Sequence, residues 1–323
     1  MDLFKKLPHS IIENILCLIP IKDAARTSIL SKEWRYHWTK IPKLVLDEDM
    51  FEVPDFVNPP PLEERVHNIL SQKEGKSYWC KIFYAFYQIL LKHEGPIHEF
   101  TLRFCEDEDC VEIELILCYL SRNYSVKKLT LDLSWGYVLH LSVFSFYQLI
   151  DLRLIDCKLG DGTITFNAFD SLTNLCLKNV DISKKMLLHL LSNCPLLKSL
   201  TLVEYSPHDY NPEGYTVTNL FECFPTVEKL SICFSIIVDR ILQSQKCSSI
   251  LEDCSDILLE HLNELEILDL TDENKMAGLD FVKFILAKSP MLKKVRITLP
   301  RDIHKDDELQ VVLLSLQRAS PMA

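Results

Sequence analysis

Residues that could perform chemistry are few in this sequence, and their spacing does not fit a catalytic or metal site. The run His93-Glu94-Gly95-Pro96-Ile97-His98 is one residue longer than the H-E-x-x-H zinc motif. Its Gly-Pro pair also breaks the helix that would place both histidines on one face. The sequence therefore predicts no metal ion and no catalytic residue.

Glycine and cysteine patterns exclude further kinds of site. The seven glycines form neither G-x-G-x-x-G nor G-x-x-x-x-G-K-[ST], and no G-x-S-x-G is present. The nearest cysteine pairs, Cys105/Cys110 and Cys247/Cys254, lack a second pair or histidines at ligand spacing. The acidic run 106–109 could attract a cation but is typical of a solvated turn. We expect free thiols and no cofactor.

Charge is distributed unevenly along the 323 residues. The chain carries 35 basic and 46 acidic residues, a net charge of −11, which argues against a nucleic-acid binder with a general basic field. Residues 1–40 hold seven basic and four acidic side chains, a local charge of +3, which leaves −14 for the remainder. A basic head on an acidic body indicates that the head meets an acidic partner.

Two apolar stretches bear on the compartment. Residues 11–21 are interrupted by Glu13 and Asn14 and make a poor signal peptide, and the uncharged run 133–150 is a weak membrane candidate. A reducing compartment, the cytoplasm and/or the nucleus, is therefore expected, with the cysteines acting as small apolar residues.

Internal repeats give the fold. Residues 149–159 fit the leucine-rich-repeat consensus L-x-x-L-x-L-x-x-C-x-L at every fixed position. Cys157 takes the Asn/Cys position and is expected to pack in a buried turn. Shorter matches of the form L-x-x-L-x-L begin at Ile41, Ile97, Val126, Leu172, Leu197, Val227, Leu265 and Leu292.

Prolines recur in phase with these repeats. Pro195, Pro225 and Pro290 each stand two residues before a repeat and end an apolar helical pattern, over 186–193, 217–223 and 281–288. Helix, proline turn and short strand form one unit, which buries its apolar edge only when units stack. The prediction is an α/β fold: a small helical head followed by a leucine-rich-repeat solenoid, with a curved parallel sheet and helices on its convex side.

The expected domains follow from these patterns. The head covers 1–40, the repeats 41–300 with a proline-rich loop at 52–61 and an insertion at 239–256, and a tail or cap covers 301–323. In the head, Leu7-Pro8 starts a helix whose apolar residues span an arc of about 160°, wider than one packing contact needs. Pro20 is expected to end this helix, a second helix covers 22–30, and Ser31 caps a third that carries Trp34 and Trp38 on one face.

The head resembles a known family. Leu7-Pro8, Ile11-Ile12, Ile15-Leu16 and the run from Ile19 to Trp38 are similar to the F-box of plant F-box/leucine-rich-repeat proteins. Residues 289–295 and 316–321 are similar to the FBD-type carboxy-terminal region of the same proteins. The resemblance implies a non-catalytic substrate-recognition subunit of an SCF-type cullin–RING ubiquitin ligase. The expected partners are an SKP-type adaptor, through it cullin and RING subunits, and a protein substrate.

Residue roles follow from the resemblance by position. It implies that Leu7 and Pro8 enter a groove of the adaptor and that this contact is supported by Ile11, Ile15, Leu16, Pro20 and Ile21. It implies packing of the head on the first repeat by Leu30, Trp34 and Trp38. Two other interpretations stay open: a scaffold that binds proteins without driving their degradation, and a small-molecule receptor.

The substrate surface is expected on the sheet face where side chains alternate with the buried leucines. Its rows are small, polar and of both signs, which suits a protein or peptide better than a deep apolar ligand. The candidate residues are Asp151, Arg153, Asn174, Lys178, Thr201, Ser231, Asp269 and Arg296.

Overall fold

The computed structural model describes residues 7–32, 34–50, 72–105, 110–133, 136–160, 169–203, 226–233, 258–268 and 275–298. The chain forms two compact units, residues 1–134 and 135–323, and each is described by itself. The loop expected at 52–61, the insertion at 239–256 and the tail at 301–323 lie outside the described residues, as does the helix expected at 217–223.

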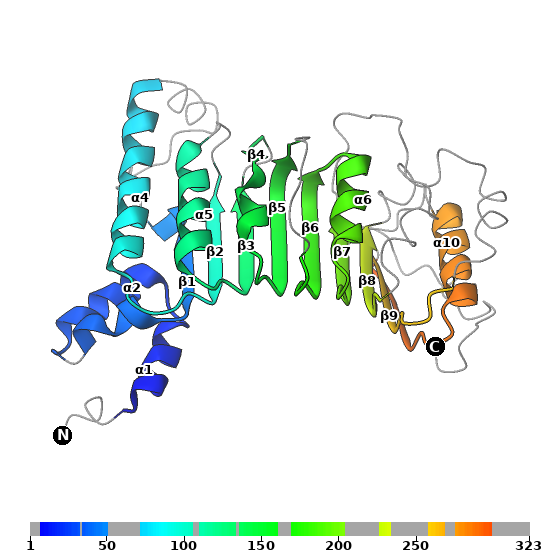
Figure 1. The fold of residues 1–323 in the computed structure, drawn as a ribbon, viewed down its shortest axis with the longest axis horizontal. Helices are drawn as coiled ribbons and strands as arrows, with labels where there is room; N and C mark the ends of the chain where they lie inside the picture. Colours follow the sequence, from blue (N-terminus) through cyan, green and yellow to red (C-terminus); the bar gives the residue numbers. More distant parts are fainter. Residues whose placement is uncertain are drawn as a thin grey trace. The chain divides into compact units, whose positions relative to one another are not determined.

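The first unit begins with the helical head. Its helices are α1 (His9–Leu16), α2 (Ile21–Arg26) and the 3₁₀ turns η2 (Thr27–Ile29) and η3 (Trp34–Lys40). Strands β1 (Lys43–Asp47), β2 (Glu99–Phe104) and β3 (Lys128–Leu133) pair in parallel, with η4 (Glu48–Met50), α4 (Gln72–Lys92) and α5 (Val111–Asn123) in the connections. Figure 1 shows α4 and α5 side by side, and Phe83 of α4 contacts Phe104 of β2 with ring centroids 4.8 Å apart.

The second unit continues the repeat. Strands β5 (Asp151–Leu159), β6 (Asn174–Asp181), β7 (Ser199–Val203), β8 (Lys229–Cys233), β9 (Glu264–Leu268) and β10 (Lys294–Ile297) pair in parallel in chain order, and β4 (Val138–Leu139) adds to β5. Helices α6 (Lys184–Ser192) and α10 (Lys275–Lys288) and the 3₁₀ turn η5 (Leu141–Ser145) connect the strands. Pro195 and Pro290 follow α6 and α10 as expected. The predicted fold class, a helical head followed by a parallel α/β repeat array, is confirmed.

The core consists of apolar side chains that pair in register from strand to strand. In the first unit Leu44, Phe100 and Leu129 are paired across three strands and are fully buried. In the second unit one such row is Leu152, Leu175, Leu200, Leu230 and Leu265. Each buried leucine stabilises the fold by roughly 2 kcal/mol relative to an exposed one.

The register corrects the repeat frame at β9. Leu265 pairs with Leu230 and Val295, so the repeat runs Leu262-x-x-Leu265-x-Ile267 and not from Leu265 as predicted. Ile267, which a repeat beginning at Leu265 would place on the open face, is fully buried. The face residues of β9 are therefore Glu264, Glu266 and Leu268, and Asp269 lies outside the described residues.

The backbone of β5 and of β6 turns left-handed at one corresponding residue. Asp156 and Asn179 both have φ of 51°, and the Asn179 side-chain amide donates a hydrogen bond of 2.7 Å to Asp156 Oδ1. Asp and Asn tolerate this left-handed conformation better than most residues. Cys157, directly after Asp156, is buried as predicted, but it lies within β5 and not in a turn.

Two further observations concern cysteines and membranes. No disulfide joins the cysteines of the described ranges. In the part of the chain that the structure describes, no helix combines the length and the apolar character that a bilayer crossing needs.

Replacing Asn179 with Val should lower the free energy of unfolding by about 2 kcal/mol, because a β-branched residue disfavours φ of 51° and the hydrogen bond to Asp156 is lost. Urea titration followed by circular dichroism measures the change. Asn179→Gly should be less harmful, since it relieves the backbone strain. Asn174→Val, at the start of the same strand, is the control; an equal loss there would contradict the explanation.

Candidate functional site

The head is built on two prolines that precede helices. Pro8 and Pro20 occupy the N-cap positions of α1 and α2 with nearly identical backbone angles, and each proline carbonyl accepts hydrogen bonds from the first turn. Proline suits this place because it has no backbone N–H, and an N–H at the start of a helix would have no acceptor within the helix. Pro8 therefore starts α1 as predicted, whereas Pro20 begins α2; α1 already ends at Leu16.

Helix α1 has two apolar stripes. Ile12 and Leu16 are buried inside the head, while Ile11 and Ile15 are 44% and 40% exposed. Pro8, Ile11 and Ile15 repeat at helical spacing and share one side, and Leu18, in the turn after the helix, is also exposed. The wide apolar arc of this helix is thus explained by one internal contact and one surface that the described chain leaves open.

The structure divides the predicted adaptor residues. Pro8, Ile11, Ile15 and Pro20 are exposed, and Leu7 is half-buried. Leu16 and Ile21 are almost fully buried and cannot touch a partner in this conformation. Their expected role was to support the contact made by Leu7 and Pro8, and from their buried positions they can do so only from beneath the surface. Leu18, Ile29 and Tyr36 are exposed apolar residues that sequence reasoning did not select.

The third segment of the head is a 3₁₀ helix, which changes the expected tryptophan face. With three residues per turn, i and i+3 align, so Trp34 shares its side with His37 rather than with Trp38. Trp34 and His37 are buried, with ring centroids 6.5 Å apart, and Trp38 is half-buried. Leu30 is exposed, which corrects its expected packing on the first repeat. Ser31 caps the segment: its Oγ accepts from Trp34 N at 3.3 Å.

A histidine pair joins α1 to η3. His9 Nδ1 and His37 Nε2 are 3.3 Å apart, so one ring must be neutral where it meets the other. Burial, and then the neighbouring His9, lower the pKa of His37. His37 therefore favours its neutral form in this link between α1 and η3.

The head is attached to the repeats of the first unit by a turn after α4. The amides of Glu94 and Gly95 both donate to Thr39 O, at 2.8 and 3.0 Å. A Cβ on Gly95 would lie 2.6 Å from Lys40 Cα, so only glycine allows this approach. Residues 93–98, which the sequence offered as an imperfect zinc motif, thus hold head and repeat together.

His93 is the buried residue of this turn. Among the described residues, neither of its ring nitrogens has a hydrogen-bond partner. Tyr124 packs at 6.1 Å between ring centroids, and its hydroxyl donates to His93 O. Burial lowers the pKa of His93 to about 4. Its ring is therefore neutral at physiological pH.

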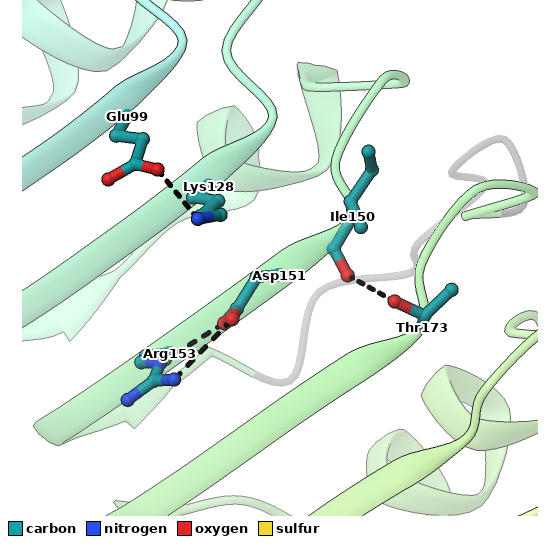
Figure 2. Close-up of polar contacts among 6 residues, drawn as sticks. All are labelled: Glu99, Lys128, Ile150, Asp151, Arg153 and Thr173. Carbon is teal, nitrogen blue, oxygen red and sulfur yellow. Dashed lines mark hydrogen bonds and ion pairs between the residues drawn. The ribbon is translucent and has the colours of Figure 1, made fainter. Parts of the chain in front are cut away.

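The predicted substrate-face residues lie on one sheet face of the second unit, but they are not equally accessible. Arg153 and Arg296 are exposed, Asn174, Lys178 and Thr201 are half-buried, and Asp151 and Ser231 are buried. Ser231 donates to Glu266 at 3.0 Å, which removes it from the expected contact surface. Asp151 likewise serves Arg153: Arg153 Nε donates to Asp151 Oδ1 at 3.1 Å (Figure 2).

Cross-strand ion pairs also line the corresponding face of the first unit. Lys128 Nζ lies 2.6 Å from Glu99 Oε1 (Figure 2), and Arg103 pairs with both Asp47 and Asp132, at 3.1 and 3.7 Å. Their positions between the buried residues of each strand could have been found from the repeat, since flanking residues share this face. Their mutual distances needed the register.

Comparison with known proteins agrees with this architecture. The F-box domain family matches residues 4–46, and the family of the LRR repeats of FBD-associated F-box protein At5g56370 matches residues 120–211. The chain thus has one region similar to an F-box domain and another similar to the leucine-rich repeats of an FBD-associated F-box protein. The F-box match covers the described head and β1 except for its last residue, Asp47.

Relatives from Arabidopsis thaliana share this combination in their names. F-box/FBD/LRR-repeat protein At1g13570 is 34% identical over 205 residues, which is 62% of this chain and 44% of the relative. F-box/LRR-repeat protein At4g14103 is 29% identical, over 64% of this chain and 50% of its own length. F-box/FBD/LRR-repeat protein At2g04230 is 26% identical, over 72% and 47%. The chain spans about half the length of the curated relatives it matches.

Replacing Gly95 with Ala should lower the free energy of unfolding by about 1–3 kcal/mol, because the added methyl group meets the Lys40 backbone. Chemical denaturation monitored by tryptophan fluorescence measures this. Gly160→Ala is the matched control, since its Cβ would lie 3.6 Å from Val138 Cγ1, an ordinary contact. Equal stability of the two variants would contradict the close approach of Gly95 to the Lys40 backbone.

His93 should make the protein less stable in mild acid. Below its ordinary pKa of 6.5 the unfolded chain takes up a proton that the folded chain, with a pKa of about 4, does not. Stability is therefore full above pH 6.5 and falls toward pH 4, with a loss of about 2 kcal/mol between pH 7 and 5. His93→Phe should remove this loss in urea titrations at the two pH values. His261→Gln, at an exposed position, should retain it.

Proposed function

We propose that this chain is the substrate-recognition subunit of an SCF-type ubiquitin ligase. Its F-box docks on an SKP-type adaptor, the adaptor connects it to cullin and RING subunits, and the repeats hold a protein substrate. F-box domains generally bind such adaptors, and F-box/LRR proteins are typically non-catalytic. The observation that carries the proposal is the exposed stripe of Pro8, Ile11 and Ile15 within the F-box match.

The stripe has the properties of an interface. Two half-exposed isoleucines beside an exposed Leu18 form an apolar surface that gains free energy when a partner removes it from water. The core beneath, Ile12 and Leu16, holds the helix in place before the partner arrives. Binding therefore pays little for ordering α1.

Charge around the stripe supports an acidic partner. Arg26, Lys32, Arg35 and Lys40 are exposed on the head, whose described acidic side chains are Glu13 on α1 and Asp23, which pairs with Arg26 at 3.0 Å. Such an excess of basic side chains accelerates association with an acidic adaptor, and salt weakens the effect. In this proposal the chain itself performs no reaction, and ubiquitin transfer takes place on the other subunits.

Replacing Ile11 and Ile15 together with Glu should weaken binding to a purified SKP-type adaptor at least about 30-fold, because both apolar contact and charge complementarity are lost. Isothermal titration calorimetry of the full chain measures the affinity. Leu196→Glu changes an equally exposed apolar residue in the second unit and should leave adaptor binding unchanged. Unchanged affinity of the Ile11/Ile15 variant would refute the proposal.

A second variant guards against unfolding of the head. The double variant Lys32→Glu with Arg35→Glu changes two exposed residues. It should slow association with the adaptor at low salt, while the circular dichroism spectrum stays the same. In cells, captured partners should accumulate under proteasome inhibition when the F-box is intact. Partners that do not accumulate would instead support a scaffold that binds proteins without their degradation.

A further inference from the structure

One row of side chains crosses the open sheet face of the second unit without interruption. Its members pair in register from β5 to β10, and we call it the central row: Arg153, Cys176, Thr201, Ser231, Glu266 and Arg296. Arginine stands at both ends. Between them, the members of the row on β6, β7 and β8 are small and uncharged, which leaves space above the sheet along the row.

Arg153 is held over a shielded carboxylate. Its Nε and Nη2 donate to the two oxygens of Asp151, at 3.1 and 3.4 Å. The Arg153 side chain is 55% exposed, whereas that of Asp151 is 12% exposed. The pair therefore shows its positive part to the solvent, and its negative part is covered.

Arg296 repeats this arrangement at the other end. Its Nη1 lies 3.5 Å from Glu266 Oε1, and the second oxygen of Glu266 accepts from Ser231. Arg296 is 58% exposed and Glu266 is 25% exposed. Two hydrogen bonds hold Arg153 and one longer ion pair positions Arg296, so each guanidinium keeps N–H donors that its carboxylate does not use.

The face as a whole is basic, although the chain carries −11. Among the described residues of this face, basic side chains outnumber acidic ones: Arg153, Lys178, Lys229, Lys294 and Arg296 against Asp151, Glu264 and Glu266. The acidic members are the more shielded partners in both arginine pairs. A partner with clustered negative charge is therefore favoured over a neutral or basic one.

We propose that this face binds an acidic segment of a protein, rich in Asp and Glu, which crosses the strands along the central row. This rests on the proposed function, in which the repeats hold a protein substrate, and it names the chemistry of that substrate. Carboxylates of the segment meet Arg153 and Arg296 in bidentate pairs, and smaller side chains lie over Cys176 and Thr201. Five strand spacings separate the arginines by about 24 Å, the length of roughly seven extended residues.

The experiment uses the full chain and a fluorescein-labelled peptide of ten glutamates, followed by fluorescence anisotropy at low salt. Wild type should bind the peptide, and binding should weaken steeply as salt rises. Arg153→Gln and Arg296→Gln should each weaken it about tenfold. Arg122→Gln, at an exposed position of α5, is the matched control and should not change peptide binding.

Removing Arg153 alone leaves Asp151 without its partner, so a second variant keeps the test sound. Asp151→Asn with Arg153→Gln removes both charges and should bind as weakly as Arg153→Gln while circular dichroism is unchanged. Unchanged affinity in the arginine variants would overturn the proposal. An equal loss with Arg122→Gln would also do so, and so would tighter binding of a ten-nucleotide polyuridylate than of the peptide.

The outcome is separable from that of the proposed function. The Ile11/Ile15 variant should lose the adaptor and still bind the glutamate peptide, because its changes lie in the F-box. If the peptide does not bind while the adaptor does, the acidic substrate class is wrong and the adaptor role stands.

Discussion

The parallel register of the strands is the constraint on which the other features depend. A single repeat exposes one apolar edge and cannot be stable alone. Once Leu152, Leu175 and Leu200 align, each strand both covers its neighbour and offers its own edge to the next. The same alignment forces the residues between the leucines into rows on the opposite face. The burial that stabilises the fold therefore also creates the surface that we propose for substrate.

The head depends on a different interaction, a close approach of two backbones. Thr39 O accepts two amides from the turn at Glu94 and Gly95, and the missing side chain of Gly95 lets Lys40 come near. Buried His93 stays neutral beneath this turn. These contacts connect the F-box to the repeats within the first unit without using the outward stripe of α1. A partner can therefore bind the α1 surface that we propose for the adaptor without disturbing the contacts between head and repeats.

The two proposed surfaces work by contrasting physics. On α1, exposed Ile11 and Ile15 provide binding free energy by leaving water, and the surrounding basic residues chiefly affect the rate. On the sheet face, fixed guanidinium groups at Arg153 and Arg296 provide direction and selectivity for carboxylates, with little apolar area. One surface suits a constant partner, and the other discriminates among many.

Spacing in the sequence was enough to predict the strands, the head and much of the surface. Leucines at i, i+3 and i+5 define a strand wherever neighbours stack, and Leu7-Pro8 predicted the start of α1. The wide arc of α1 already indicated a second partner. These features are local, because they depend on backbone geometry and on the period of apolar residues.

Tertiary structure decided what local spacing left equivalent. Residues 262–270 satisfy the repeat in two frames, and only pairing with Leu230 selects the one that buries Ile267. The 3₁₀ geometry of η3, the burial of Leu16 and His93, and the placement of Arg153 over Asp151 depend likewise on contacts between distant segments. The sequence determined which residues form the repeats, and packing between repeats determined which of them face a partner, because burial is a property of neighbours.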